Sequence, residues 1–352
     1  MSKYWNKTIQ RLSPYVAGEQ PQDQQYIKLN TNESPIKPSK AVHEAMHAAV
    51  ENDLNLYPDP NCSDLKKQIA ECYKVSIDNV FVGNGSDEVL AHIFAGLFDH
   101  DKALICPDIS YGFYPTYACL YNIKLQQIPL SNTFEINLEE YPAENGGVIF
   151  ANPNAPTSIA LGLDEIKTFL QRNQSSVVVV DEAYVDFGAR SCIELISQFD
   201  NLIVVQTLSK SRSLAGLRVG YAIGAPALIE GLERVKNSFN AYPLDKIALA
   251  GAQAAIKDKS ALQASVNEII SNRQYTRKAL TQMAFTVLES TTNFLFVSPQ
   301  FIAAEALYLR LKEAGILVRY FNAPRIDQYL RITIGTKPEM QLLIETISKI
   351  KS

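Results

Sequence analysis

The sequence contains few cysteines, and they are not arranged for cross-linking. Five cysteines are scattered among 352 residues, and no two of them have C-x-x-C spacing. An odd, scattered set excludes a disulfide framework and is typical of reduced thiols in a cytoplasmic protein. The N-terminal stretch MSKYWNKTIQRLS lacks an apolar segment, so we expect no secretion signal.

Long hydrophobic runs and long basic runs are also missing. No apolar stretch reaches the roughly 18 residues of a membrane span. The formal net charge is −4, and no cluster of lysines and arginines suggests a nucleic-acid partner. No basic helix-turn-helix segment precedes residue 30, which argues against a regulator that senses a cofactor. We therefore expect neither a membrane nor a nucleic-acid partner.

Short apolar runs alternate with longer helical patterns over most of the chain. Four successive valines at 177–180 indicate a strand that is buried on both faces, as in a parallel sheet covered by helices. The alternation predicts an α/β fold with a mostly parallel, seven-stranded sheet. The strand candidates are 80–82, 103–106, 125–130, 147–151, 176–181, 202–207 and 219–224.

Three regions are predicted from these patterns. Residues 1–30 are polar and are expected to form an arm that joins the smaller domain and covers the active site. Residues 31–245 should form the large domain, and residues 246–352 a smaller α+β domain. Strands are expected in that domain at 294–298, 316–320 and 330–335, with a helix around 301–314.

A zinc-hydrolase motif, H-E-x-x-H, occurs at 43–47 within a helix predicted from about Ser39 to Asp53. Two histidines four residues apart on a helix share a face and could bind zinc. However, Val42 and Met46 belong to the apolar stripe, which leaves His43 and His47 largely on the solvated side. Because a third ligand has no clear source, we expect no metal site.

The segment GNGSDE at 83–88 follows the first strand candidate and precedes a helical pattern. Glycine allows close approach of the backbone to an anion, and the start of a helix offers free N–H groups. The segment is therefore a candidate phosphate cradle. An ordinary helix start capped by Ser86 or Asp87 explains the pattern equally well.

Two further strand candidates end in ionisable groups. Asp181 ends the run of valines, where a carboxylate is costly unless a cation or donor meets it. Lys210 and Arg218 follow the strand at 202–207, with the small hydroxyl of Ser209 beside the lysine. The simpler interpretation of Asp181 is a hydrogen bond to a nearby loop, and the simpler interpretation of Lys210 is a solvated side chain. Together the groups fit pyridoxal 5'-phosphate, which has an aldehyde, a protonatable ring nitrogen and a phosphate.

At this point the chain resembles the fold type I pyridoxal-phosphate aminotransferases, and within them the histidinol-phosphate aminotransferases. The resemblance covers nearly the whole chain. Its most specific motifs are DEAYVDF (181–187), TLSK (207–210) and AGLRVGY (215–221). Shorter matches are LSPY (12–15), LNTNESP (29–35), YPDP (57–60), GNGSDE (83–88), SYGFY (110–114), NPNAPTS (152–158) and LRITIGT (330–336).

The resemblance implies a role for each matching residue. Lys210 would form the Schiff base with the cofactor and move the proton at the substrate α-carbon. Asp181 would pair with the ring nitrogen, Tyr184 would bond the phenolic oxygen, and Tyr111 would stack on the ring. The phosphate-binding candidates are Gly85, Ser86, Asp87, Thr207, Ser209 and Arg218. Tyr57 is similar to a tyrosine that reaches the phosphate of a neighbouring subunit, which implies a homodimer.

One motif departs from the family pattern N-P-x-N-P-T-G. Ala155 stands where the family has the asparagine that touches the phenolic oxygen, and Ser158 replaces the glycine. Asn154 is one residue away and is retained as a candidate cofactor ligand. With Ala155 in that place, Tyr184 would carry the contact with the phenolic oxygen alone unless Asn154 substitutes.

The substrate-binding candidates implied by the resemblance are Tyr15, Arg319 and Arg331. Two anion-binding arginines fit both glutamate and a phosphorylated amine. The expected reaction is transfer of an amino group from glutamate to imidazole-acetol phosphate, giving histidinol phosphate and 2-oxoglutarate with ping-pong kinetics. Aromatic-amino-acid transamination and threonine-phosphate decarboxylation remain alternatives on the same fold. The sequence assigns no role to Arg325 beyond exposure to solvent.

Overall fold

The apolar runs of the first two thirds of the chain form one seven-stranded sheet. The computed structural model describes residues 2–16, 18–52 and 54–351. The strand order is β2-β8-β7-β6-β5-β3-β4; β8 runs antiparallel to both of its neighbours, β2 and β7, and the other described pairings in this sheet are parallel. The predicted α/β class and mostly parallel sheet are confirmed. The strands are β2 (Val80–Asn84), β3 (Leu104–Pro107), β4 (Leu125–Ile128), β5 (Gly147–Ala151), β6 (Val178–Asp181), β7 (Leu202–Thr207) and β8 (Val219–Gly224).

Successive residues of the central strands enter two different hydrophobic cores. Val178 and Val180 of β6 lie in one core, and Val179 lies in the other. The core around Val179 is closed by helices α4 (Gly85–Gly96), α5 (Phe113–Tyr121) and α7 (Pro226–Phe239). Helices α3 (Ser63–Tyr73), α6 (Leu163–Arg172) and α8 (Lys246–Lys257) close the other core. A strand covered on both faces has no polar side, which explains the run of valines.

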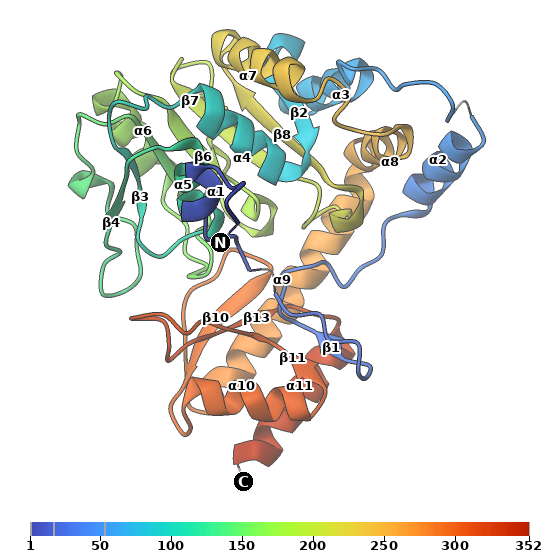
Figure 1. Ribbon diagram of the computed structural model, residues 1–352. Helices are drawn as coiled ribbons and strands as arrows, with labels where there is room; N and C mark the ends of the chain where they lie inside the picture. The colour runs from blue at the N-terminus through green and yellow to red at the C-terminus, as the bar shows by residue number, and fades with distance from the viewer. Residues whose placement is uncertain (1, 17, 53, 352) are drawn as a thin grey trace.

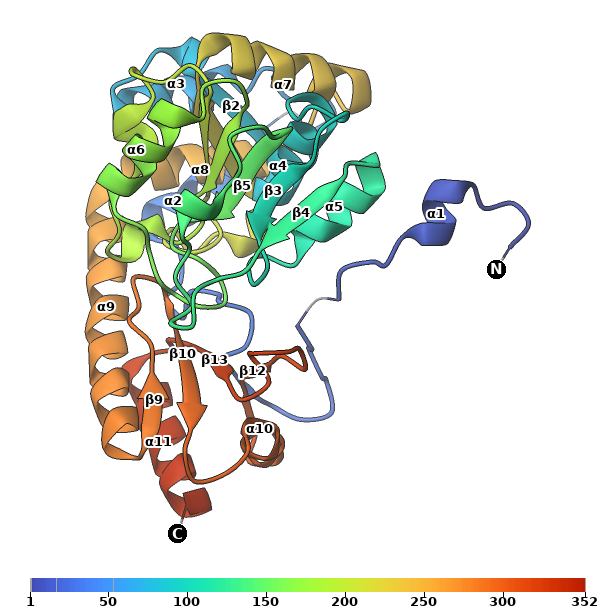
Figure 2. The ribbon, with the colours of Figure 1, turned by 90° about the vertical axis from the view of Figure 1, so that its left-hand side faces the viewer.

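A second lobe is built on a four-stranded antiparallel sheet with the order β12-β13-β10-β9 (Figure 1). Helix α9 (Lys259–Gln282) runs from the upper lobe along the side of this sheet (Figure 2). The register places Arg319 opposite Arg331 on neighbouring strands. The other elements are β9 (Phe285–Val287), β10 (Phe294–Pro299), α10 (Ala304–Glu313), β12 (Arg319–Tyr320), β13 (Leu330–Thr333) and α11 (Lys337–Lys351). The three residues of β9 are too few for the pattern to predict.

The N-terminal segment contacts both lobes and contains two elements that its polar sequence does not predict. In α1 (Lys7–Arg11), the Arg11 guanidinium donates to the Asn122 side chain at the end of α5, at 2.8 Å. Further along, β1 (Ile27–Lys28) pairs in parallel with β11 (Ile316–Leu317) of the lower lobe. Figure 2 shows the segment passing from beside the upper lobe to the lower lobe.

Helix α2 (Lys40–Val50) carries the H-E-x-x-H motif and is shorter than predicted. It ends before Asp53, which lies outside the described residues. His43 and His47 are exposed on this helix, whereas Val42 is buried. In the described ranges, no three histidine, cysteine, aspartate or glutamate side chains are grouped to hold a metal ion.

None of the helices in the described part of the chain combines the length and apolar character needed to cross a membrane. The predicted domain boundaries after residues 30 and 245 stay predictions.

Candidate active site

A cavity of about 270 Å³ lies beyond the carboxyl ends of β5, β6 and β7. This is where an open α/β sheet binds its ligands, because the polar ends of neighbouring strands and the starts of helices meet there. Nine of the predicted site residues line it: Ser86, Asp87, Tyr111, Asp181, Tyr184, Thr207, Ser209, Lys210 and Arg218.

Asp181 is the last residue of β6 and is only 5% exposed. The Tyr114 hydroxyl donates to one carboxylate oxygen at 2.9 Å, and the Ala183 N–H donates to the other at 3.3 Å. Burial raises the pKa of Asp181 to about 6, although both hydrogen bonds oppose the shift. A buried carboxylate on the wall of a cavity is suited to a cationic ligand, which would offset its desolvation.

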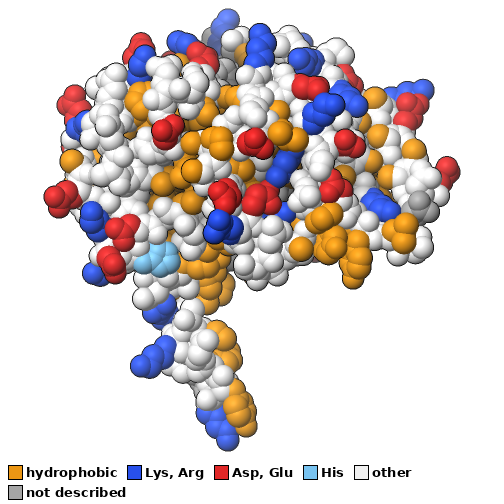
Figure 3. All heavy atoms as spheres, turned by 90° about the horizontal axis from the view of Figure 1, so that it is seen from above, with side chains coloured by type: hydrophobic (Ala, Val, Ile, Leu, Met, Phe, Trp, Pro, Cys, Tyr) orange, Lys and Arg blue, Asp and Glu red, His pale blue; other side chains and the backbone are white. Residues whose placement is uncertain are grey.

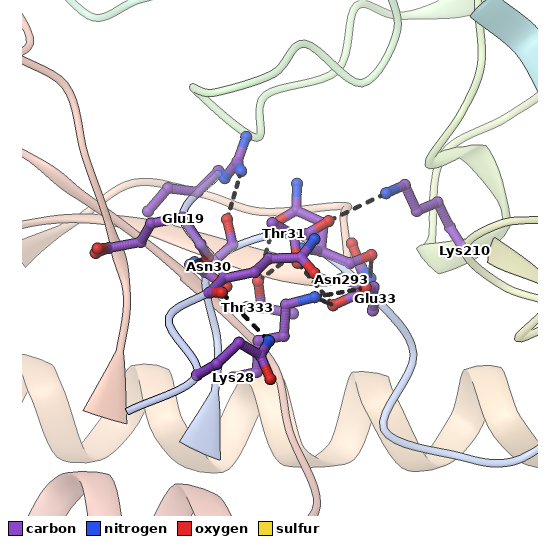
Figure 4. Close-up of polar contacts among 12 residues, drawn as sticks. Glu19, Lys28, Asn30, Thr31, Glu33, Lys210, Asn293 and Thr333 are labelled. Carbon is purple, nitrogen blue, oxygen red and sulfur yellow. Dashed lines mark hydrogen bonds and ion pairs between the residues drawn. The ribbon is translucent and has the colours of Figure 1, made fainter. Parts of the chain in front are cut away.

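Lys210 follows the end of β7 and extends its amine to the opposite wall of the cavity. The amine donates to the carbonyl oxygen of Thr31 at 3.3 Å (Figure 4). It also lies 5.8 Å from the centre of the Tyr184 ring. Beside it, the Thr207 hydroxyl donates to the Ser209 hydroxyl at 2.9 Å and shapes the turn after the strand. The partly buried amine therefore lies among Thr31, Tyr184 and the small hydroxyls.

The start of α4 forms a cradle that only glycine permits. Gly85 has a φ of +78°, and a side-chain carbon there would lie 2.5 Å from the Arg218 guanidinium. A side-chain carbon on Gly220 of β8 would lie 2.2 Å from the backbone nitrogen of Ser86. The first N–H groups of a helix have no partner within it, so they are free for an anion. Arg218 adds positive charge and pairs with Asp87 at 2.7 Å.

The alternative of a helix start capped by Ser86 or Asp87 is wrong. Asn84 occupies the N-cap position, and its side chain makes no capping hydrogen bond. The carboxylate of Asp87 instead accepts hydrogen bonds from the Tyr111 hydroxyl, at 2.8 Å, and from Arg218. Asp87 thus holds in place two side chains that line the cavity.

A second cavity, of about 600 Å³, lies between the two lobes and contains the substrate-binding candidates Tyr15, Arg319 and Arg331. The ring of Tyr15 stacks on Phe113 with 4.3 Å between ring centres, which holds the arm over this cavity. Residues common to the two cavities are Thr31, Tyr111, Ala155, Tyr184 and Lys210. The two cavities therefore adjoin along these residues, which include Lys210.

Arg331 has the environment of an anion-binding arginine. One of its terminal nitrogens donates to the Asn30 carbonyl at 2.9 Å, and its guanidinium lies 5.4 Å from the Phe294 ring centre and 5.6 Å from that of Phe321. Its buried Nε has no hydrogen-bond partner among the described residues. Burial lowers the pKa of the guanidinium. A buried, unpaired donor is costly and favours an incoming anion.

Three predicted cofactor ligands line neither cavity: Gly85, which forms part of the cradle at the start of α4, Tyr57 and Asn154. Tyr57 is 80% exposed, and its ring stacks on Tyr242 with 4.6 Å between centres. Asn154 is buried, but its amide is fully occupied elsewhere: the Ser110 hydroxyl donates to it at 2.8 Å, and it donates to the Ile109 carbonyl and the Thr157 hydroxyl. Asn154 therefore holds the loop at 109–110 rather than facing the cavity.

Ala155 and Ser158 are the two departures from the family motif. Ala155 lines both cavities and presents no polar atom to them. Ser158 has a φ of +69°, a left-handed conformation that glycine adopts more easily. Its hydroxyl donates to the Glu289 carbonyl at 2.8 Å, which compensates part of that cost. The serine thus has a structural explanation.

The segment 30–33 contributes to the site although the sequence analysis assigns it no role. Thr31 accepts the hydrogen bond from Lys210, and Glu33 lines the smaller cavity while pairing with Lys28 at 2.8 Å (Figure 4). Asn32 donates to the Tyr184 hydroxyl at 2.9 Å. Four polar residues in succession between Leu29 and Ser34 are the sequence signal for this segment.

Comparisons with known proteins agree with this geometry. The aminotransferase class I and II family matches residues 24–347. "Histidinol-phosphate aminotransferase 1" of Hydrogenovibrio crunogenus is 54% identical over 99% of this chain and 98% of its own length. The histidinol-phosphate aminotransferase of Clostridium acetobutylicum is 52% identical over 100% and 99%. The crystal structure of the Sinorhizobium meliloti histidinol-phosphate aminotransferase, in complex with pyridoxal-5'-phosphate, matches with a TM-score of 0.88, 25% identity and 99% coverage of both chains. The chain therefore belongs to the class I and II aminotransferases, and within them to the histidinol-phosphate aminotransferases.

Proposed function

We propose that the protein is a pyridoxal 5'-phosphate-dependent transaminase that interconverts imidazole-acetol phosphate and glutamate with histidinol phosphate and 2-oxoglutarate. One observation carries the proposal: the Lys210 amine lies where a cavity containing Asp181 meets a cavity containing Arg319 and Arg331. Relatives that share about half of their residues along the whole chain carry the same activity in their names, which supports the choice of substrate.

The smaller cavity fits this cofactor group by group. Lys210 supplies the amine for the aldehyde, and Asp181 the carboxylate for a protonated ring nitrogen. The space left by Gly85, the N–H groups at the start of α4 and the Arg218 guanidinium suit the phosphate. When bound, the cofactor supplies an electron sink for the carbon that loses its proton.

The remaining work falls to side chains of this chain. The free amine of Lys210 removes and returns the proton at the substrate α-carbon. Tyr111, held by its bond to Asp87, would stack on the cofactor ring. The Tyr184 hydroxyl would donate to the phenolic oxygen. Thr207 and Ser209 bring small hydroxyls to the phosphate side of the cavity.

The larger cavity suits a substrate with two negative charges. Arg331 offers an unpaired buried Nε, and Arg319 lies beside it on the neighbouring strand. Glutamate has two carboxylates and histidinol phosphate has a doubly charged phosphate, so both can use these arginines. Phenylalanine has a single carboxylate and an apolar ring, which makes the aromatic alternative a poorer fit.

We further propose that the enzyme acts as a homodimer. Tyr57 is exposed and lines neither cavity of its own chain, as expected if it reaches the phosphate of a second copy. Figure 3 shows the N-terminal segment projecting from the body with hydrophobic side chains along it, and Tyr4 and Val16 are 84% and 75% exposed. A second copy would cover these apolar side chains.

The region boundaries at 30/31 and 245/246 and a cytoplasmic location belong to the same proposal. The five cysteines are free, which is consistent with a reducing compartment. The seven-stranded sheet lies within 31–245 and the four-stranded sheet within 246–352, which supports two units, whereas α8 (Lys246–Lys257) packs in the core of the upper lobe.

The test is chemical trapping. Borohydride reduction of the protein with pyridoxal 5'-phosphate should leave a pyridoxyl adduct on the peptide that contains Lys210, found by mass mapping. The visible absorption band should then change on adding histidinol phosphate. A pyridoxyl adduct on another lysine, or the absence of any adduct, would refute the cofactor role of Lys210. An absorption band that changes with phenylalanine but not with histidinol phosphate would favour the aromatic alternative.

A further inference from the structure

We propose that Asn32 is a positioning residue for this reaction: its side-chain amide holds the Tyr184 hydroxyl so that the phenolic proton points into the active site. The inference rests on the proposed function, because it concerns the donor that meets the cofactor. The direct observation is the hydrogen bond from the Asn32 amide nitrogen to the Tyr184 oxygen, at 2.9 Å. Asn32 is 1% exposed and lines the larger cavity.

The orientation of the Asn32 amide is fixed by Thr333 on β13. The backbone N–H of Asn32 donates to the Thr333 hydroxyl oxygen at 3.0 Å, so the hydroxyl proton is available for another acceptor. That proton goes to the Asn32 side-chain carbonyl, also at 3.0 Å. With the Thr333 proton directed to the carbonyl of the amide, the NH₂ group of the amide faces Tyr184.

The backbone of Asn32 is fixed as well. Its φ of +56° lies in the left-handed region, where asparagine and glycine are tolerated best among the amino acids. The Asn293 side chain donates to the Asn32 carbonyl at 3.0 Å, and Asn293 is completely buried. Asn32 is therefore held by three bonds to the lower lobe, two through its backbone and one through its side chain, and its amide is presented to Tyr184 in the upper lobe.

The consequence is that Tyr184 keeps a proton to donate. A phenolic oxygen that accepts a hydrogen bond directs its own proton elsewhere, and cooperativity makes it a better donor. The other groups common to both cavities are occupied: Tyr111 donates to Asp87 at 2.8 Å, and the Thr31 hydroxyl donates to Glu33 at 2.6 Å. Ala155 has no polar side-chain atom. Of the shared side-chain hydroxyls, Tyr184 is thus the donor that remains for a ligand.

The experiment measures the pH midpoint of the visible absorbance of the protein loaded with pyridoxal 5'-phosphate. Losing a donor leaves more electron density on the cofactor oxygen, so the nitrogen that joins Lys210 to the cofactor holds its proton more tightly. Asn32→Gly, which suits the left-handed backbone, should raise the midpoint by about 0.5 to 1 pH unit. Asn32→Asp should raise it further, because a carboxylate attracts the Tyr184 proton.

Thr333→Val tests whether Thr333 orients the Asn32 amide. It should also raise the pH midpoint, by less than Asn32→Gly does. A Tyr184→Phe background separates positioning from a general effect on the fold: there, Asn32→Gly should add no further shift. Melting temperatures of the loaded variants provide the check on folding.

The inference is overturned if the midpoint of Asn32→Gly and Asn32→Asp equals that of the parent protein. It is also overturned if Asn32→Gly produces the same shift with and without the Tyr184 hydroxyl. Both results would leave the proposed function intact, because the parent would still carry the cofactor on Lys210. A parent protein without an adduct at Lys210 would instead refute the function, and this inference with it.

Discussion

The two halves of the active site are assembled in different ways. The smaller cavity takes its ionic groups from consecutive strand ends of one sheet, with Asp181 at the end of β6 and Lys210 just after β7. The larger cavity combines Tyr15 of the arm with Arg319 and Arg331 of the lower lobe. The first arrangement depends on one sheet, whereas the second requires the two lobes and the arm to be placed correctly. Changes in the first should affect the chemistry, and changes in the second should affect which substrate is accepted.

The largest effect is expected at Lys210, because no amino donor can react without its amine. Lys210→Ala should lower the transamination rate at least about a thousand-fold with histidinol phosphate and with glutamate alike. Steady-state rates with both donors measure this, and Lys67→Ala, at an exposed site on α3, is the matched control. Substantial turnover by Lys210→Ala would show that the smaller cavity does not carry the chemistry.

Replacing Arg331 should show the opposite pattern, with a strong effect on substrate binding and little effect on the bound cofactor. Arg331→Gln should lower kcat/KM for histidinol phosphate by about ten- to a hundred-fold, since charge-assisted hydrogen bonds to the anion are lost. The visible absorbance of the loaded enzyme should stay unchanged. Arg310→Gln, at an exposed position on α10, is the control. A changed absorbance without a change in KM would contradict the division between the two halves.

The same division explains what the sequence could predict. Asp181 ends β6, Lys210 follows the end of β7 and Arg218 directly precedes β8, so local pattern and the rule for strand ends locate them together. Asn32 depends on Thr333, which lies 301 positions away, and no local pattern joins the two. The cofactor half of the site is therefore largely predictable from local sequence, whereas the substrate half is not.

Asn154 shows a different limit. Its amide type and its place in the motif are suitable for a cofactor ligand, but the Ser110 hydroxyl and the Ile109 carbonyl take up its hydrogen-bonding groups. A single peptide unit separates it from Ala155, which does face the cavity. The direction of a side chain in an irregular loop depends on partners from elsewhere in the chain, and the sequence does not give these.

The cofactor half also contains a titration that can be measured without substrate. Burial raises the pKa of Asp181 from 3.8 to about 6, so between these values this carboxyl binds more protons in the folded cofactor-free protein than in the unfolded chain. The contribution of Asp181 to the free energy of unfolding should therefore fall as pH rises from about 4 to 6. Asp181→Asn should remove this contribution from the pH dependence. Glu182, whose pKa burial raises to about 7, makes a contribution of the same sign that Asp181→Asn leaves in place.

Thermal or denaturant unfolding of the cofactor-free protein across this pH range measures the difference. Asp164→Asn, at an exposed site on α6, provides the control for loss of one charge. A pH dependence in Asp181→Asn equal to that of the parent would mean that the carboxylate does not titrate as its burial requires. The smaller cavity would then lack the buried titrating carboxylate that distinguishes it from the larger cavity.

The smallest effect is expected where the halves touch, at Arg325. The sequence predicts only solvent exposure for this arginine. It pairs with Asp108 at 2.9 Å and donates to the Leu130 and Ser131 carbonyls at 2.8 Å each. It therefore joins the loop after β12 to the upper lobe. Arg325→Ala should raise KM for histidinol phosphate a few-fold, about the effect of one partly exposed ion pair. Asp108→Ala should do the same. Because both variants remove the same ion pair, the increase in KM of the double variant should be smaller than the product of the two single increases, as KM and kcat measurements on all four proteins will show. Fully multiplying effects would mean that the two residues act separately on the substrate, and that the lobes are held together by other contacts.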